Sequence, residues 1–238
     1  AKALSDNKQI LQRITNVLVA DSAFSKKPFI DNMLGIGFNV VSRLRHDAAL
    51  YYLWEGDPTG KPGRPRVKGE KIDFKNIDKS KVAILDTDES NGQVYALKAW
   101  CKSLHRKISL VIHILPKGGH RLYFSTDESM SGRDVMEYYC TRFQIEFCFR
   151  DAKQFVGLTD SQARDTRKLD FAFNSSFTAV NVAKIMCSEY NLSIGRIKAL
   201  IINAYYAQRI IDVFENNPNT QLNHEIVNEI FGFAADAA

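Results

Sequence analysis

The feature that most constrains the fold is a short apolar run that ends at an aspartate and is followed by a helical pattern and a second apolar run. Residues 16–20 read NVLVA, and Asp21 follows directly. The next segment, SAFSKKPFIDNMLGIG, has helical spacing and a glycine near its end, and residues 38–44 (FNVVSRL) favour a strand. This order predicts a β-α-β unit with a parallel pair of strands. Functional side chains of such units lie at the carboxyl ends of strands, where Asp21 stands.

The middle of the chain differs from this first part in its composition. Residues 57–71 (DPTGKPGRPRVKGEK) carry three prolines, three glycines and five basic residues, so no regular element is expected there. Residues 93–103, 107–115 and 121–126 are rich in β-forming side chains and are separated by basic turns. We expect these three runs to be antiparallel strands.

A helical pattern dominates the last part of the chain. Ser131 is a suitable N-cap with Asp134 three residues later, and the pattern predicts one helix from there to about Phe155. Residues 171–190, 194–215 and 222–233 predict further helices. The fold class expected is therefore α/β with a helical C-terminal part.

The predicted helix that ends near Phe155 would have one polar face and one face that packs in the core. At 100° per residue, four polar side chains fall within roughly 60° of one another. These four are Tyr139, Arg142, Glu146 and Lys153. The opposite side, expected to pack in the core, carries Ile145, Cys148, Phe149 and Ala152. On spacing alone, the polar side could also be a solvated face with a favourable Arg–Glu pair.

The pattern Tyr-x2-Arg-x3-Glu-x6-Lys is similar to the signature of bacterial insertion-sequence transposases with DDE catalytic sites. The segment VADSAFSKKPF, around Asp21, resembles the surroundings of that family's second catalytic aspartate. The resemblance covers residues 17–177. It implies a ribonuclease-H-like core in which two aspartates and a glutamate hold two Mg²⁺ (or Mn²⁺) ions.

By the same resemblance, Asp21 and Glu146 would be catalytic metal ligands, and Tyr139, Arg142 and Lys153 would hold DNA phosphates. The activity implied is metal-dependent strand cleavage and strand transfer at insertion-sequence ends. Double-stranded DNA, as transposon ends and as target, would be the partner. A homodimer on DNA is the form that the resemblance suggests.

The first catalytic aspartate of the family has no good match in the chain. It should end a strand well before Asp21, and the one upstream aspartate, Asp6, lies in a polar, helix-like segment. We therefore expect that aspartate upstream of Ala1, in an amino-terminal part that this fragment lacks. Asp127 could be a rival ligand or could start a turn. The alternative function is a truncated, catalytically incomplete remnant that only binds DNA, and a more remote one is a metal-dependent nuclease of another family.

The basic segment offers a second DNA contact. Gly63 to Arg66 resembles the Gly-Arg-Pro core of minor-groove hooks, although a plain basic loop would also touch phosphates. The residues expected to bind DNA here are Lys61, Arg64, Arg66 and Lys68. Trp54 and Trp100 could stack on an unpaired base, but in a β-rich chain they are more often core or strand-face residues.

Composition agrees with an anionic partner. The formal net charge is +5 at pH 7. No window approaches the run of about 18 apolar residues that a membrane span requires, so a cytoplasmic protein without membrane association is expected. The expected organisation is a core part at 1–45, a β-rich basic insertion at 46–120, the rest of the core at 121–170 and C-terminal helices at 171–238.

Overall fold

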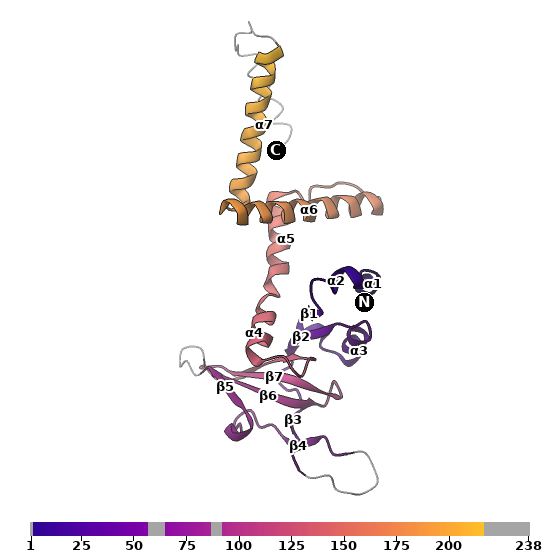
Figure 1. The fold of residues 1–238 in the computed structure, drawn as a ribbon, viewed down its shortest axis with the longest axis vertical. Coiled ribbons are helices and arrows are strands. Elements are labelled where there is room, and N and C mark those ends of the chain that lie inside the picture. The colour runs from indigo at the N-terminus through magenta and orange to yellow at the C-terminus, as the bar shows by residue number, and fades with distance from the viewer. Residues whose placement is uncertain (1, 57–64, 87–91, 217–238) are drawn as a thin grey trace. The chain divides into compact units, whose positions relative to one another are not determined.

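The computed structural model describes residues 2–56, 65–86 and 92–216, and the chain forms two compact units, Ala1–Phe143 and Gln144–Ala238. Figure 1 shows the helices and strands of the two units. Among the described residues, no helix is both long and apolar enough to cross a membrane.

The first unit is built on one mixed sheet. Its helical elements are α1 (Lys2–Asp6), α2 (Lys8–Leu11), η1 (Ser22–Phe24), α3 (Lys27–Gly35), η2 (Lys79–Lys81) and α4 (Gly132–Cys140). Its strands are β1 (Val17–Val19), β2 (Asn39–Leu44), β3 (Leu50–Leu53), β4 (Lys68–Lys71), β5 (Ala83–Asp86), β6 (Gln93–Cys101), β7 (Arg106–Ile114) and β8 (His120–Ser125). The strand order is β1-β2-β8-β7-β6-β3-β4, and β5 pairs with β6.

The pairing confirms the parallel pair and the strands predicted at 93–103, 107–115 and 121–126, whereas the expectation of no regular element over 57–71 is wrong at its end, where Lys68–Lys71 pair with β3 as β4. β1 and β2 are parallel, with Val17 opposite Asn39. β6, β7 and β8 pair antiparallel in sequence order, and β8 also pairs antiparallel with β2. The strands of residues 46–120 thus share a sheet with the β-α-β unit, and the mixed α/β class is confirmed and consistent with a ribonuclease-H-like fold.

Apolar side chains pack on both faces of the sheet. On one face, Ile30 and Met33 of α3 join the larger cluster, which includes Val40 and Phe124. On the other face, Val135 of α4 packs in a smaller cluster with Val41 and other strand residues. Figure 1 shows α4 lying over the sheet near β7. The two faces are separated because successive side chains of a strand point to opposite sides, as for Val40 and Val41.

The second unit contains α5 (Phe143–Phe155, whose first residue belongs to the first unit), α6 (Thr166–Tyr190) and α7 (Ile194–Asn216). The predicted helices at 171–190 and 194–215 are confirmed. The earlier start of α6 has a local cause, since Asp165 accepts hydrogen bonds from the backbone N–H groups of Arg167 and Lys168. The predicted helix at 222–233 lies outside the described residues.

The single helix predicted from Ser131 to Phe155 is wrong, because α4 ends at Cys140 and α5 begins at Phe143. The hydroxyl of Thr141 donates to the carbonyl of Tyr138 at 2.7 Å, and the N–H of Arg142 bonds to Tyr139, only three residues back. Such bonds compete with the regular α-helical ladder and interrupt it. Tyr139 and Arg142 therefore belong to the first unit and Glu146 and Lys153 to the second.

The predicted core side of the helix is correct only in part. Ala152 is fully buried, but Ile145 and Phe149 are 59% and 43% exposed. In the second unit, Cys148 and Ala152 of α5 and Val156, directly after it, join a buried cluster, and the rings of Phe149 and Phe177 meet edge-on at 5.2 Å. Because Ile145 and Phe149 still remain exposed in large part, α5 buries less than its composition suggested.

Candidate functional site

Asp21 stands where the β-α-β pattern predicted, directly after the strand β1 and its neighbour Ala20. It caps the short helix η1, and its Oδ1 accepts hydrogen bonds from the N–H of Ala23 (3.1 Å) and the hydroxyl of Ser22 (3.2 Å). Its side chain is 49% exposed. One carboxylate oxygen is thus fixed by the backbone, while the group remains accessible to solvent.

A pair of serines fixes the backbone behind Asp21. The hydroxyl of the buried Ser42 donates to the carbonyl of Ala20 at 2.8 Å. It also lies 2.8 Å from the hydroxyl of Ser25, which donates to the carbonyl of Arg43 at 2.9 Å. These bonds join the segments on both sides of Asp21 to β2. The carboxylate is therefore carried by a held strand end rather than by a free loop.

Cationic and phenolic side chains border the carboxylate. A terminal nitrogen of Arg142 lies 3.6 Å from Oδ2 of Asp21. The guanidinium of Arg142 also lies 4.5 Å from the ring centre of Phe143, and the rings of Tyr139 and Tyr123 are 4.9 Å apart. Arg142 and Tyr139, predicted from the signature, are thus beside Asp21 within one unit.

This surrounding sets the protonation of both groups. The pKa of Asp21 is lowered from 3.8, chiefly by the hydrogen bond from the Ala23 N–H, and further by Ser22 and by the charges of Arg142 and Arg43. Burial raises the pKa of Tyr139 above 10.0. At neutral pH, Asp21 is a carboxylate and Tyr139 is a neutral phenol that can donate a hydrogen bond.

A basic hollow of about 480 Å³ begins at Ser22, the residue after Asp21. Its lining includes Arg43 and Arg45 of the β2 segment and Arg121 of β8. Sequence reasoning missed these three arginines. The alternation in VVSRLR was the available signal, because residues two apart on a strand share a face and β2 is the parallel neighbour of β1.

Asp127 starts a turn. Its Oδ1 accepts hydrogen bonds from the N–H and the hydroxyl of Ser129, at 2.9 and 2.6 Å. These bonds lower the pKa of Asp127. Within the described ranges, no three His, Cys, Asp or Glu side chains gather closely enough to hold a metal ion.

Glu146 and Lys153 lie on α5 of the second unit, in its first and last turns, and both are exposed. An acidic residue near the start of a helix and a basic one near its end are stabilised by the helix dipole. Their predicted roles with Asp21 stay predictions.

The basic segment is described only in part, since Lys61 and Arg64 lie outside the described residues. The guanidinium of Arg66 lies 3.9 Å from the ring centre of Trp54, and the ammonium of Lys68 lies 5.3 Å from that of Tyr51. Trp54 is 37% exposed, so it is a surface residue and not part of the core.

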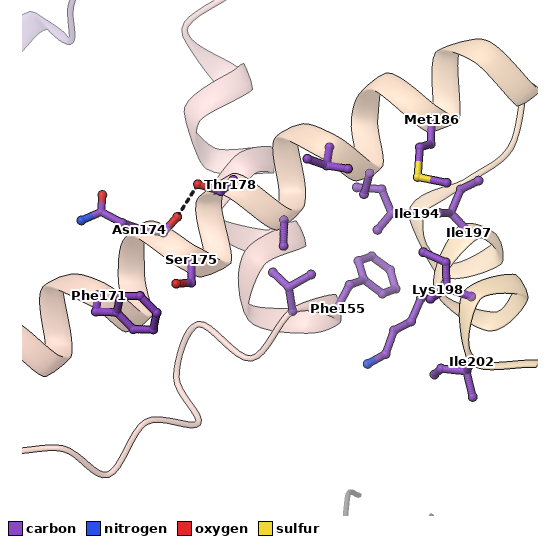
Figure 2. Close-up of a pocket in the computed structure, with 15 residues that line it drawn as sticks. Phe155, Phe171, Asn174, Ser175, Thr178, Met186, Ile194, Ile197, Lys198 and Ile202 are labelled. Carbon is purple, nitrogen blue, oxygen red and sulfur yellow. Dashed lines mark hydrogen bonds between the residues drawn. The ribbon is translucent and has the colours of Figure 1, made fainter. Parts of the chain in front are cut away.

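The second unit has an apolar groove of about 660 Å³, shown in Figure 2. Phe155, Met186 and Ile197 line it, and Thr178 donates a hydrogen bond to the carbonyl of Asn174 at its border. One charged side chain, Lys198, is among the described residues of the lining. A lining of this kind suits neither a metal ion nor a phosphate.

The fold and the Asp21 site define a class: an α/β protein with an ionised carboxylate at a strand end, bordered by arginines, as suits an enzyme that acts on a polyanion. The family model of the transposase DDE domain matches residues 3–182. The chain therefore belongs to the transposase DDE domain family. It matches none of the curated proteins with which it was compared.

Membership gives the general function. The protein is a transposase of the DDE type, a family of DNA-acting nuclease and transferase enzymes that generally depend on divalent metal ions. The matched range contains the Asp21 unit together with Glu146 and Lys153. The family predicted from the Tyr-x2-Arg-x3-Glu-x6-Lys signature is thus confirmed.

Proposed function

We propose that this protein catalyses metal-dependent DNA strand cleavage and strand transfer at the ends of an insertion sequence. The observation that carries the proposal is the state of Asp21: an accessible carboxylate on a held strand end, kept ionised and placed 3.6 Å from Arg142. Family membership supports the same chemistry. Double-stranded DNA is the proposed partner, and a homodimer in the cytoplasm is the proposed working form.

The donor chemistry of Asp21 and Glu146 fits a hard divalent cation. Mg²⁺ and Mn²⁺ prefer carboxylate oxygens, and both side chains offer an exposed carboxylate. When bound, a pair of such ions stabilises the attacking and leaving oxygens of an in-line displacement at phosphorus. Asp21 and Glu146 would be two of the three carboxylates that the family's chemistry requires.

The neighbouring residues would hold the DNA. Arg142 can bind a phosphate with two parallel hydrogen bonds, and Tyr139 stays protonated and can donate one. Arg43 extends the cationic surface from Asp21 along β2, and Arg45, which is ion-paired with Asp47 at 3.1 Å, follows directly after the strand. Lys153 and the basic segment with Lys61, Arg64, Arg66 and Lys68 are proposed as further phosphate contacts.

The alternative is a remnant that binds DNA and performs no chemistry. One observation favours it: Asp6, the one aspartate before Asp21 in the sequence, lies on α1 and not at a strand end. The two functions differ in their products, since a transposase cuts and joins DNA whereas a remnant only binds it.

The test uses the full-length protein, a DNA carrying the insertion-sequence ends and a target plasmid, with and without Mg²⁺. Asp21→Asn and Glu146→Gln should each lower cleavage and joining by more than about 100-fold, beyond the usual effect of changing an outer partner of a metal ligand. DNA binding should remain. Glu137→Gln, which removes an exposed carboxylate of α4, is the matched control and should cleave normally.

Full activity of Glu146→Gln would contradict the metal-ligand role. Binding without any Mg²⁺-dependent product in the unaltered protein would establish the remnant instead.

A further inference from the structure

A second basic hollow, of about 330 Å³, lies where β3, β4 and β6 adjoin. β4 stands at one end of the strand order, and β1, which leads to Asp21, stands at the other. The hollow is therefore separate from the carboxylate site. Its lining includes Arg66, Val67, Lys68, Trp100, Lys102 and His105.

The charged side chains among the described residues that line this hollow are all basic. Arg66, Lys68 and Lys102 are basic residues, and no carboxylate is among the described residues of the lining. Lys68 begins β4, and Lys102 follows the last residue of β6, with β3 between the two strands. Two strand spacings correspond to about 10 Å, and Lys68 is opposite Leu53 whereas Lys102 lies beside Ala49, which adds an offset of about 13 Å along β3. Phosphates of one DNA strand follow each other at about 3.4 Å along the helix axis, so both lysines can engage one strand.

The backbone that carries these residues is held. The N–H of Lys102 donates to the carbonyl of Ala49 at 3.1 Å, just before β3. His105 has a positive φ of 52° in the turn before β7, and its N–H bonds to the carbonyl of Lys102 at 3.3 Å. The basic groups are thus presented from strand ends and a tight turn.

Aromatic rings lie among the cations. Arg66 lies over Trp54 at 3.9 Å, and Lys68 lies 5.3 Å from the ring centre of Tyr51. Tyr51 and Trp100 are directly opposite in the antiparallel pair of β3 and β6, so their side chains are neighbours on one face. Basic side chains packed on aromatic rings, with further aromatic side chains beside them, are typical of surfaces that bind along a nucleic-acid backbone.

We propose that this hollow binds the phosphodiester backbone of DNA, through Arg66, Lys68 and Lys102, as a contact surface separate from the Asp21 site. The proposal rests on the proposed function for its choice of DNA as the polyanion. It adds Lys102 and His105 to the residues that meet DNA, and it places Trp100 beside them. Trp100 would lie under the backbone of a duplex or under a base of an unpaired strand.

The test measures DNA binding by the chain in EDTA, over a series of salt concentrations, with a labelled duplex and with one of its strands alone. In Lys68→Gln/Lys102→Gln, the slope of log K against log[salt] should become shallower by about 1.8 for duplex, or by about 1.4 if the single strand is the ligand. Lys79→Gln/Lys117→Gln removes the same charge from exposed sites elsewhere and should leave the slope unchanged.

A second readout reports on the hollow directly. The chain has two tryptophans, so Trp54→Phe leaves Trp100 as its one indole fluorophore. Binding of DNA at the hollow should change Trp100 emission, and the change should be absent in the double lysine variant. The DNA form that gives the larger change is the ligand.

The outcomes separate the two proposals. Equal slopes for both double variants, with DNA bound and Trp100 emission unchanged, would overturn the role of the hollow and leave the cleavage site untouched. A chain that binds neither DNA form at low salt would overturn this inference, whereas metal-dependent cleavage is judged by its products with the full-length protein.

Discussion

Ser42 offers a sharp test of how the strand end at Asp21 is held. Its side chain is fully buried, and its hydroxyl donates to the carbonyl of Ala20 at 2.8 Å. Ser42→Ala removes that donor and leaves a buried carbonyl without it, which costs about 1–3 kcal/mol. A central value of about 2 kcal/mol corresponds to roughly a 30-fold lower ratio of folded to unfolded protein.

Urea unfolding followed by tryptophan fluorescence measures this loss. Trp54 and Trp100 are the two tryptophans of the chain and both belong to the first unit, so the signal reports on the unit that contains Ser42. With a slope of about 1–3 kcal/mol per molar urea, the midpoint should fall by about 1 M.

Ser109→Ala is the matched control. Ser109 is also buried, and its hydroxyl donates to the carbonyl of Met130 at 2.8 Å, away from Asp21. Both variants should lose similar stability, but at a temperature where both are folded, Ser42→Ala alone should lower metal-dependent cleavage. A change in unfolding free energy below about 0.5 kcal/mol for Ser42→Ala would refute the reasoning, since that is the range of inconsequential surface changes.

Two further predictions concern packing and charge. Gly132→Val should destabilise the first unit by about 1–3 kcal/mol, measured by the same urea titration, because a Cβ at this position would lie 2.5 Å from the Cβ of Ala96. The pKa of Asp21 lies below 3.8, so the stability from its hydrogen bonds is present above that pH and is lost only as pH falls through the lowered pKa. Arg142→Gln should raise the pKa of Asp21 part of the way back toward 3.8, because the larger cause, the hydrogen bond from the Ala23 N–H, remains. A carboxyl ¹³C NMR titration that found no rise would contradict the contribution of Arg142.

Local patterns were sufficient for the β-α-β unit and for the antiparallel strands β6, β7 and β8, but not for β3, β4 and β5. The parallel pairing of β1 with β2 and the place of Asp21 follow from the order of apolar runs, turns and a helix, since connections between adjacent parallel strands obey a few rules. The predicted continuity of the helix through Thr141 failed. A hydroxyl bonded to a nearby carbonyl competes with the helical ladder, and hydrophobic periodicity does not register that competition.

The sequence by itself determined the family signature, the strand that carries Asp21 and the neighbourhood of Tyr139 and Arg142 on one short stretch, because these depend on residues close together in the chain. The tertiary structure alone decided which distant cations gather. Arg43 and Arg121 line one hollow, and Lys68 and Lys102 line another, because hydrogen bonding between strands brings together segments that are far apart in sequence. Strand register is set by the whole apolar core, and no single segment of this chain encodes it.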